Sequence, residues 1–259
     1  AEAVTRAGQL SIRWIESKMN KYLNTLLETD NEDFVVASDT DSIYLTLDKL
    51  VDGAFGNLVE ENEKAISPEK VVDFLDKVCS TKLEPYINKC YDELAEYMNA
   101  YEQKMFMARE AIASKGMWTA KKRYVLNVYD NEGVRYTTPK LKVMGLEAVK
   151  SSTPAVCREK IKDALNVIMT GTEEEMIQFI ETFREDFNSL PAEDIAFPRG
   201  VNGIRKYTNG DTYIKHTPIH VKGSIIYNRL LRVNKLGFDY EKISDGDKIK
   251  FLYLKEPNP

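Results

Sequence analysis

Two aspartates, Asp39 and Asp41, stand two residues apart between two short apolar segments. The segments, 34–37 and 43–47, are rich in β-branched, aromatic and other apolar residues, and they predict the two strands of a hairpin. Residues i and i+2 of an extended chain project to the same side, so both carboxylates would lie together at the hairpin tip. Because Mg²⁺ and Mn²⁺ prefer carboxylate oxygens, the run predicts a divalent-metal site.

Other interpretations of this run are a solvated turn and a calcium-binding loop. Aspartate is common in turns because its side chain bonds to nearby backbone groups, so a surface turn without metal is an open alternative. An EF-hand loop needs another oxygen ligand and a glycine at the next two positions, where Ile43 and Tyr44 stand. The EF-hand class is therefore disfavoured.

The composition is that of a globular protein with room for one large or two modest domains. The chain has 259 residues, 43% of them hydrophobic. Its three cysteines, Cys79, Cys90 and Cys157, lack metal-ligand spacing and predict free thiols in a reducing compartment. No apolar run approaches the length of a membrane span, and the first residues are not a signal peptide. The start at Ala1 instead of Met suggests a piece of a longer chain.

The net charge is −5, but two stretches of the chain are basic. Residues 115–150 hold eight Lys or Arg and three acids, and residues 197–232 hold seven Lys or Arg and one acid. Lys and Arg release counterions when they neutralise phosphates, so these stretches predict surfaces that follow a nucleic-acid backbone. Ordinary solvated faces are the alternative.

The periodicity of apolar residues divides the chain near Gly145. Apolar positions at helical spacing predict helices over 4–26 and 68–87, the second with Ser67 as its N-cap. Further helices are predicted from Pro154 and, after a capping box at Thr172, from Glu173. Alternation in 123–129 and 134–138, around a turn at 130–133, predicts a second hairpin. The glycine-rich stretch 198–223 predicts a loop or a β-rich tip.

Several motifs in order make the chain resemble the family B DNA polymerases. The run Ser38–Tyr44 resembles their Asp-Thr-Asp-Ser active-site motif, and Lys121–Tyr124 resembles the basic-aromatic motif that follows it. Residues 139–145 and 151–154 resemble the passage from palm to thumb in replicative polymerases of large tailed bacteriophages. The resemblance implies an α+β fold: a palm-type antiparallel sheet with packed helices in residues 1–145, then a mainly helical thumb in 146–259, which stops before the family's C-terminal tail.

The resemblance also implies roles for individual residues. It places the main catalytic metal ligand on Asp41 and a second acid on Asp39, for a complete site with two Mg²⁺ ions and Mn²⁺ as a substitute. DNA-binding roles fall on Lys121, Lys122, Arg123 and Tyr124, on Lys150, Ser151 and Ser152, and on Lys215, His220 and Lys222. If the first group forms a strand, Lys122 and Tyr124 share one face, and Lys121 and Arg123 share the other.

The expected function is that of the C-terminal portion of a template-directed DNA polymerase. Its expected partners are primer–template DNA, deoxynucleoside triphosphates and an N-terminal polymerase portion, with a sliding clamp reached only through the missing tail. No counterpart of the family's exonuclease, upstream metal-binding motif or fingers is found, so the chain alone is expected to be inactive. The expected location is the cytoplasm of a bacterial host, without secretion or membrane contact.

Two alternatives compete with a polymerase portion. A non-catalytic module that holds duplex DNA is disfavoured by Asp41, because a carboxylate near phosphates repels them. A hydrolase that uses Asp39 and Asp41 as acid and base is disfavoured because carboxylates at i and i+2 have no preset separation for such chemistry.

Overall fold

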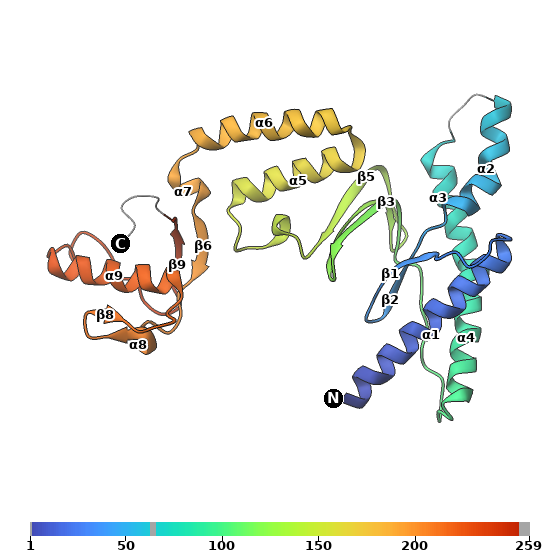
Figure 1. Ribbon diagram of the computed structural model, residues 1–259, viewed down its shortest axis with the longest axis horizontal. Coiled ribbons are helices and arrows are strands. Elements are labelled where there is room, and N and C mark those ends of the chain that lie inside the picture. Colours follow the sequence, from blue (N-terminus) through green and yellow to red (C-terminus); the bar gives the residue numbers. More distant parts are fainter. Residues whose placement is uncertain (1, 63–65, 254–259) are drawn as a thin grey trace. The chain divides into compact units, whose positions relative to one another are not determined.

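The computed structural model describes residues 2–62 and 66–253 and contains two compact units, Ala1–Lys142 (unit 1) and Val143–Pro259 (unit 2) (Figure 1). Helices outnumber strands among the described residues, and the paired strands are antiparallel. The predicted α+β class is confirmed. No helix within the described ranges combines the length and the apolar character that crossing a membrane requires.

Unit 1 combines two long helical segments with a two-stranded and a three-stranded sheet. Its elements in chain order are α1 (Glu2–Leu26), β1 (Val35–Asp39), β2 (Ser42–Leu45), α2 (Asp48–Asn62), α3 (Pro68–Val78), the π-helical segment η1 (Cys79–Leu83), α4 (Glu84–Tyr97), β3 (Ala111–Ala120), β4 (Arg123–Asn131) and β5 (Val134–Met144).

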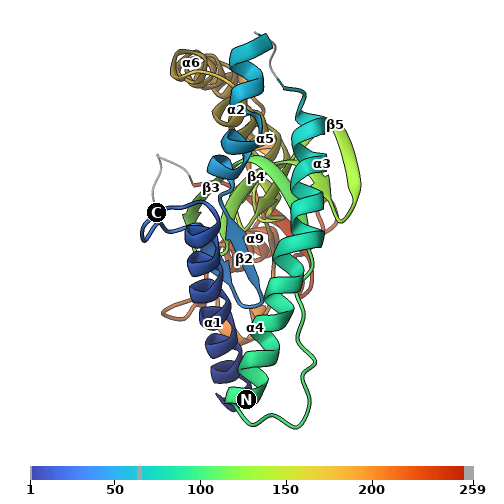
Figure 2. The ribbon, with the colours of Figure 1, turned by 90° about the vertical axis from the view of Figure 1, so that its right-hand side faces the viewer.

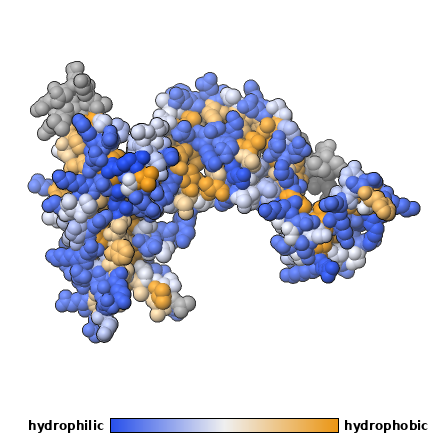
Figure 3. Space-filling view, turned by 180° about the vertical axis from the view of Figure 1, so that it is seen from behind, coloured by the Kyte–Doolittle hydropathy of each residue, from blue (hydrophilic) through white to orange (hydrophobic). Residues whose placement is uncertain are grey.

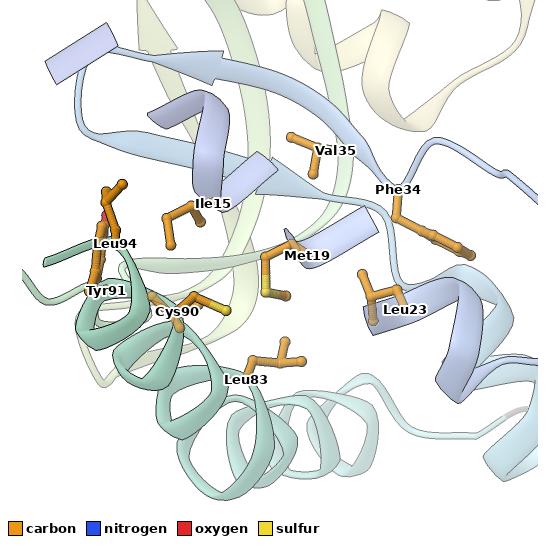
Figure 4. Close-up of a cluster of buried hydrophobic side chains, with 10 residues drawn as sticks. Ile15, Met19, Leu23, Phe34, Val35, Leu83, Cys90, Tyr91 and Leu94 are labelled. Carbon is orange, nitrogen blue, oxygen red and sulfur yellow. The ribbon is translucent and has the colours of Figure 1, made fainter. Parts of the chain in front are cut away.

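The main core of unit 1 lies between α1, the β1–β2 hairpin and α4. Ile15, Met19 and Leu23 are four residues apart on one face of α1 and are fully buried (Figure 4). They pack with buried side chains of α4 and of the residues that enter β1. Trp14 Nε1 donates a hydrogen bond to the Cys90 carbonyl at 2.9 Å, and Figure 2 shows α1 and α4 side by side. The helix predicted over 4–26 is therefore confirmed as the support of the hairpin.

The second long helical segment starts where its capping residues predict. The Ser67 side chain accepts a hydrogen bond from the Lys70 amide, and Pro68 occupies the first turn. The segment widens into the π-helical turn η1 just before Pro85, which has no amide hydrogen for the helical ladder. A π turn accommodates that missing donor and lets the helix continue as α4.

The strands of unit 1 confirm both predicted hairpins and add one element. β1 pairs with β2, and the larger sheet has the order β3-β4-β5. Glu132 and Gly133, between β4 and β5, both have positive φ, as a two-residue turn that matches the strand twist requires. β3 was not predicted, because its ten residues include Gly116 and few β-branched side chains. The sequence pattern does not predict helix α2 either.

Unit 2 consists of short helices and small strand pairs. Its elements are the 3₁₀ turn η2 (Glu147–Val149), α5 (Ala155–Thr170), α6 (Glu173–Ser189), α7 (Ala192–Ile195), β6 (Phe197–Gly200), α8 (Ile204–Tyr207), β7 (Thr208–Asn209), β8 (Thr212–Tyr213), α9 (Ile219–Val233) and β9 (Lys248–Phe251). β6 pairs with β9, and β7 pairs with β8.

The helix starts predicted for unit 2 are confirmed, and the loop or β-rich tip predicted over 198–223 is partly correct. Pro154 precedes α5, and Thr172 forms a capping box with Glu175 at the start of α6. The predicted loop contains the small β7–β8 hairpin but ends earlier, because α9 begins at Ile219. Polar residues within its first turns obscured the buried face of α9.

Candidate active site

Two hairpin turns of unit 1 lie next to each other. Asp39 and Ser42 close the first, with Thr40 and Asp41 in the turn, and Ala120 and Arg123 close the second, with Lys121 and Lys122 in the turn. The Lys122 ammonium lies 3.6 Å from the Asp39 carboxylate. The fold thus brings the acid tip and the basic turn together, although they are far apart in the sequence.

Both turns line one groove of about 1000 Å³. One end of α1 and residues 104–107 form part of its wall, and the strands β3 and β4 contribute another part. Five residues with predicted functions line it: Asp39, Asp41, Lys121, Lys122 and Tyr124. Arg123 is half-buried at the start of β4 and is not part of the lining. On the face of the molecule shown in Figure 3, hydrophobic residues interrupt a largely hydrophilic surface.

The predicted strand geometry is wrong for three of these residues. Lys121 and Lys122 occupy a turn, so the expected alternation of faces begins only at Arg123. Asp41 also lies in a turn and not on a strand, so the i, i+2 rule does not place its carboxylate beside that of Asp39. A two-residue hairpin turn reverses the chain over four residues. Asp41 occupies a central position of the first turn, and Lys121 and Lys122 occupy both central positions of the second.

The two carboxylates have different surroundings. Asp39 Oδ1 accepts a hydrogen bond from the Thr40 hydroxyl at 3.0 Å and is the oxygen nearest to Lys122. Asp41 is exposed, and within residues 2–62 and 66–253 we find no side-chain hydrogen bond or ion pair to its carboxylate. Its charge acts on Tyr91, whose pKa is raised by burial and then by Asp41. Asp41 therefore has carboxylate oxygens free for a cation.

The tip of the acid hairpin has a strained backbone. Thr40 has a φ of 49°, which is rare for a β-branched residue. The Asp41 amide donates to the Asp39 carbonyl, and the Ser42 hydroxyl donates to the same carbonyl at 3.1 Å. Lys122, in the facing turn, also has a positive φ of 59°. Strain of this kind persists only where the surrounding structure holds it, and it is concentrated at functional sites.

An aromatic cluster joins the acid hairpin to the larger sheet. The ring centroid of Tyr44 on β2 lies 5.2 Å from that of Trp118 and 5.4 Å from that of Tyr124. Burial, and then a hydrogen bond with Tyr44, raises the pKa of the Tyr124 hydroxyl well above its usual range. Tyr44 and Trp118 were not predicted as site residues. Their sequence signal is only their position next to the two turns.

A buried ion network fixes the same sheet to the helices. Asp130 is fully buried, with one oxygen bound by Arg109 and the other 2.7 Å from Arg135 Nε. Arg109 also binds Asp76 of α3 at 2.7 Å. The sequence placed Asp130 in a turn, but it ends up inside β4 because both arginines neutralise its charge there.

The predicted residues at the start of α5 lie close together in unit 2. Lys150 forms an ion pair with Glu147 at 2.9 Å, and Ser151 is exposed. Ser152 is half-buried, and its carbonyl accepts a hydrogen bond from Arg199 at 2.7 Å. These three residues form a short polar segment two residues before the helix.

The second predicted grip is not assembled on one face. His220 and Lys222 are two residues apart on α9, which turns them about 200° from each other. Lys222 lies over the Tyr213 ring at 4.8 Å, whereas His220 lies beside Phe251, with ring centroids 6.2 Å apart. Lys215 is exposed in the segment before the helix.

The acid hairpin fits a partial metal site. Across the described part of the chain there is no group of three or more His, Cys, Asp or Glu side chains that could hold a metal ion. Mg²⁺ commonly binds one or two protein carboxylates and completes its shell with water and substrate phosphates. The oxygen donors of Asp41 and Asp39 suit that arrangement, so these two residues could hold part of a metal shell.

Comparison with known proteins gives two similar sequences. The chain is 40% identical over 267 aligned residues to a protein named DNA-directed DNA polymerase from Escherichia phage RB69. It is 37% identical over 268 aligned residues to a protein of the same name from Enterobacteria phage T4. Each alignment covers the whole chain and 29% of the relative. No family model matches the chain. The resemblance that the motifs predicted is confirmed.

Proposed function

Because the whole chain is homologous to one segment of the DNA-directed DNA polymerases of T4-like phages, we propose that it forms part of a polymerase active site and of the grip on the primer–template duplex. The observation that carries this proposal is the groove of unit 1, where Asp39 and Asp41 face the turn Lys121–Lys122. Carboxylates suit metal ions, and lysines beside them suit phosphates.

The metal-binding role falls on Asp41 first and on Asp39 second. The Asp41 carboxylate has no cationic partner among residues 2–62 and 66–253, whereas Asp39 already has Lys122 nearby. When bound, two Mg²⁺ ions, or Mn²⁺ in their place, activate the primer hydroxyl and neutralise the leaving pyrophosphate of a deoxynucleoside triphosphate. The strained turn holds Asp41 at the groove wall, so little reorganisation is needed on binding.

The duplex grip falls on the basic turn and its strand. Lys121 and Lys122 project from the turn as exposed cations. Lys122 can move from Asp39 to a DNA phosphate at little cost, since an exposed ion pair of this length contributes about 0–1 kcal/mol. Tyr124 and Arg123 are more buried and would support the turn from β4. In unit 2, Lys150–Ser152 would add a phosphate contact before α5.

The remaining parts of the proposal concern the whole polymerase. The chain spans about 29% of the relatives it matches, so activity would require other polymerase segments, whether on this polypeptide or on an N-terminal partner chain. Unit 1 would belong to the palm and unit 2 to the thumb. A sliding clamp would be reached through the family's C-terminal tail, and the reaction would take place in the cytoplasm of the infected bacterium.

The decisive test is Asp41→Asn in the complete polymerase, assembled with its N-terminal portion. We expect primer extension to be lost almost entirely while duplex binding is retained, because a metal ligand disappears and phosphate repulsion falls. Asp39→Asn should reduce extension less. Asp52→Asn, at an exposed position of α2, is the matched control and should extend normally. Near-normal extension by the Asp41 variant across Mg²⁺ and Mn²⁺ titrations contradicts the assignment and leaves the non-catalytic DNA-binding alternative.

A further inference from the structure

Unit 2 contains a second groove that none of the predicted site residues lines. It has a volume of about 640 Å³ and lies beside the last turns of α9 and the segment 235–242. Its lining is strongly basic, with Arg229, Arg232, Lys235 and Lys242 against the single acid Asp211. Arg232 is bound to Asp211, which leaves three cations without an ion pair in the described part of the chain.

The segment 238–242 presents its aromatic and basic side chains to this groove. Phe238, Tyr240 and Lys242 belong to the lining, whereas the acids between them, Asp239 and Glu241, do not. The Phe238 side chain is fully exposed, at 103% of its reference area, and Tyr240 is 57% exposed. Exposed aromatic rings beside cations suit a ligand that offers both flat faces and negative charge.

The backbone holds these rings in place. Helix α9 ends in a Schellman motif, in which the Leu236 amide donates to the Leu231 carbonyl at 2.9 Å and Lys235 has a φ of 58°. The amides of Asp239 and Tyr240 then both donate to the Leu236 carbonyl at 3.1 Å. The aromatic segment is therefore an ordered turn and not a frayed helix end.

The charge balance favours an anionic ligand. The carbonyl end of α9 opposes an anion with roughly half a negative charge. Arg229, Lys235 and Lys242 together exceed that charge several-fold. The ligand should therefore combine negative charge with flat apolar faces that stack on Phe238 and Tyr240.

We propose that this groove binds unpaired nucleotides of single-stranded DNA, with bases stacked on Phe238 and Tyr240 and phosphates beside Lys235, Lys242 and Arg229. Aromatic platforms beside basic side chains are the general means of binding single strands, since every base has a π face. A duplex keeps its bases stacked on each other and offers no free faces to the rings. The choice of DNA among polyanions rests on the proposed function, but the groove does not involve Asp39, Asp41 or the basic turn.

The test compares single-stranded and duplex binding by the whole chain. A labelled oligothymidine of about 12 nucleotides and a labelled hairpin duplex serve as probes in fluorescence anisotropy. Phe238→Ala with Tyr240→Ala should weaken oligothymidine binding about tenfold or more, because each stacked base depends on an aromatic ring. Lys235→Ala with Lys242→Ala should make the negative slope of log affinity against log salt shallower by about 1.4, since two phosphate contacts are lost.

Two control substitutions test whether a loss of binding is specific to this groove. Tyr101→Ala removes an exposed aromatic side chain of unit 1 outside both grooves, and Arg184→Ala removes an exposed cation of α6. Both should leave oligothymidine binding unchanged, and circular dichroism should show that all variants are folded.

Three outcomes would overturn the proposal. Oligothymidine binding that survives the double aromatic substitution excludes stacking in this groove. An equal loss of duplex binding makes the rings part of the duplex grip. Self-association that disappears with Phe238→Ala makes the groove a contact between copies of the chain. Duplex binding by the Lys121→Ala, Lys122→Ala variant is measured separately and tests the proposed function.

Discussion

The two units differ in whether the structure brings their predicted functional residues together. In unit 1, the acid pair and most of the basic motif meet in one groove, with Lys122 3.6 Å from Asp39. In unit 2, His220 and Lys222 lie on different sides of α9, one beside Phe251 and the other over Tyr213. A tight hairpin turn fixes where its central residues point, whereas neighbouring residues on a helix diverge by about 100° each.

The difference extends to the supporting structure. The groove of unit 1 rests on a large buried cluster around Ile15 and Met19, on the aromatic contact of Tyr44, and on the buried Asp130. Unit 2 has a smaller cluster around Val201 and Val221, and α6 has no buried residue in the structure as described. Substitutions of supporting residues should therefore lower the free energy of unfolding more in unit 1 than in unit 2.

The largest expected effect is at Asp130, the centre of the ion network. Asp130→Asn removes the fully buried carboxylate between Arg109 and Arg135, which keep the more exposed Asp76 as a partner. Removing one partner of a buried pair costs about 3–5 kcal/mol of unfolding free energy. Urea unfolding followed by tryptophan fluorescence reports on unit 1, because both tryptophans, Trp14 and Trp118, lie there.

The control for this substitution is Asp73→Asn. The Asp73 side chain is 67% exposed and lies 3.2 Å from Arg135, so its loss should cost less than about 1 kcal/mol. Equal losses at Asp73 and Asp130 would show that the network does not support unit 1 in the way its burial indicates.

The next effect compares one glycine from each unit. A Cβ at Gly116 of β3 would lie 2.8 Å from the Trp118 ring and 2.9 Å from Leu126, so Gly116→Ala should destabilise unit 1 by about 1–3 kcal/mol. Nothing lies within 4 Å of a Cβ at Gly223 in α9, so Gly223→Ala should stabilise that helix by about 0.5–1 kcal/mol. Tryptophan fluorescence measures the first change and thermal circular dichroism the second. Destabilisation at both positions would remove the contrast in packing.

The smallest expected effect concerns the salt dependence of duplex binding. Lys121→Ala with Lys122→Ala should make the negative slope of log affinity against log salt shallower by about 1.8, since each phosphate contact contributes about 0.9. Sequence preference should not change, because phosphate contacts carry no base information. Titrations of a labelled duplex at several salt concentrations measure both quantities. Lys70→Ala with Lys77→Ala, at exposed positions of α3, is the matched control.

The corresponding change in unit 2 is Lys215→Ala with Lys222→Ala. Because Lys222 is held over the Tyr213 ring and Lys215 is the exposed member of the pair, we expect a slope change of at most about one contact, or 0.9. A change as large as that of the Lys121, Lys122 pair would show that Lys222 leaves the Tyr213 ring and that both lysines contact phosphates. The comparison between the units would then fail.

Local patterns in the sequence predicted much of the framework of both units. The helix over 4–26, the cap at Ser67, the capping box at Thr172 and both hairpins of unit 1 were confirmed, because each depends on residues close together in the chain. The β3 strand and α9 were missed where Gly116 or a polar first turn disrupted the pattern.

The sequence by itself determined the α+β class, the hairpin that carries Asp39 and Asp41, and the relationship to phage DNA polymerases, which rests on motifs in order. Only the tertiary structure decided that Lys121 and Lys122 occupy a turn beside those acids, that Tyr44 joins the two sheets through Trp118 and Tyr124, and that Asp130 is buried between arginines. Propensity and periodicity act over a few residues, whereas these contacts join distant segments and are fixed by the packing of α1, α3 and α4 against the sheets.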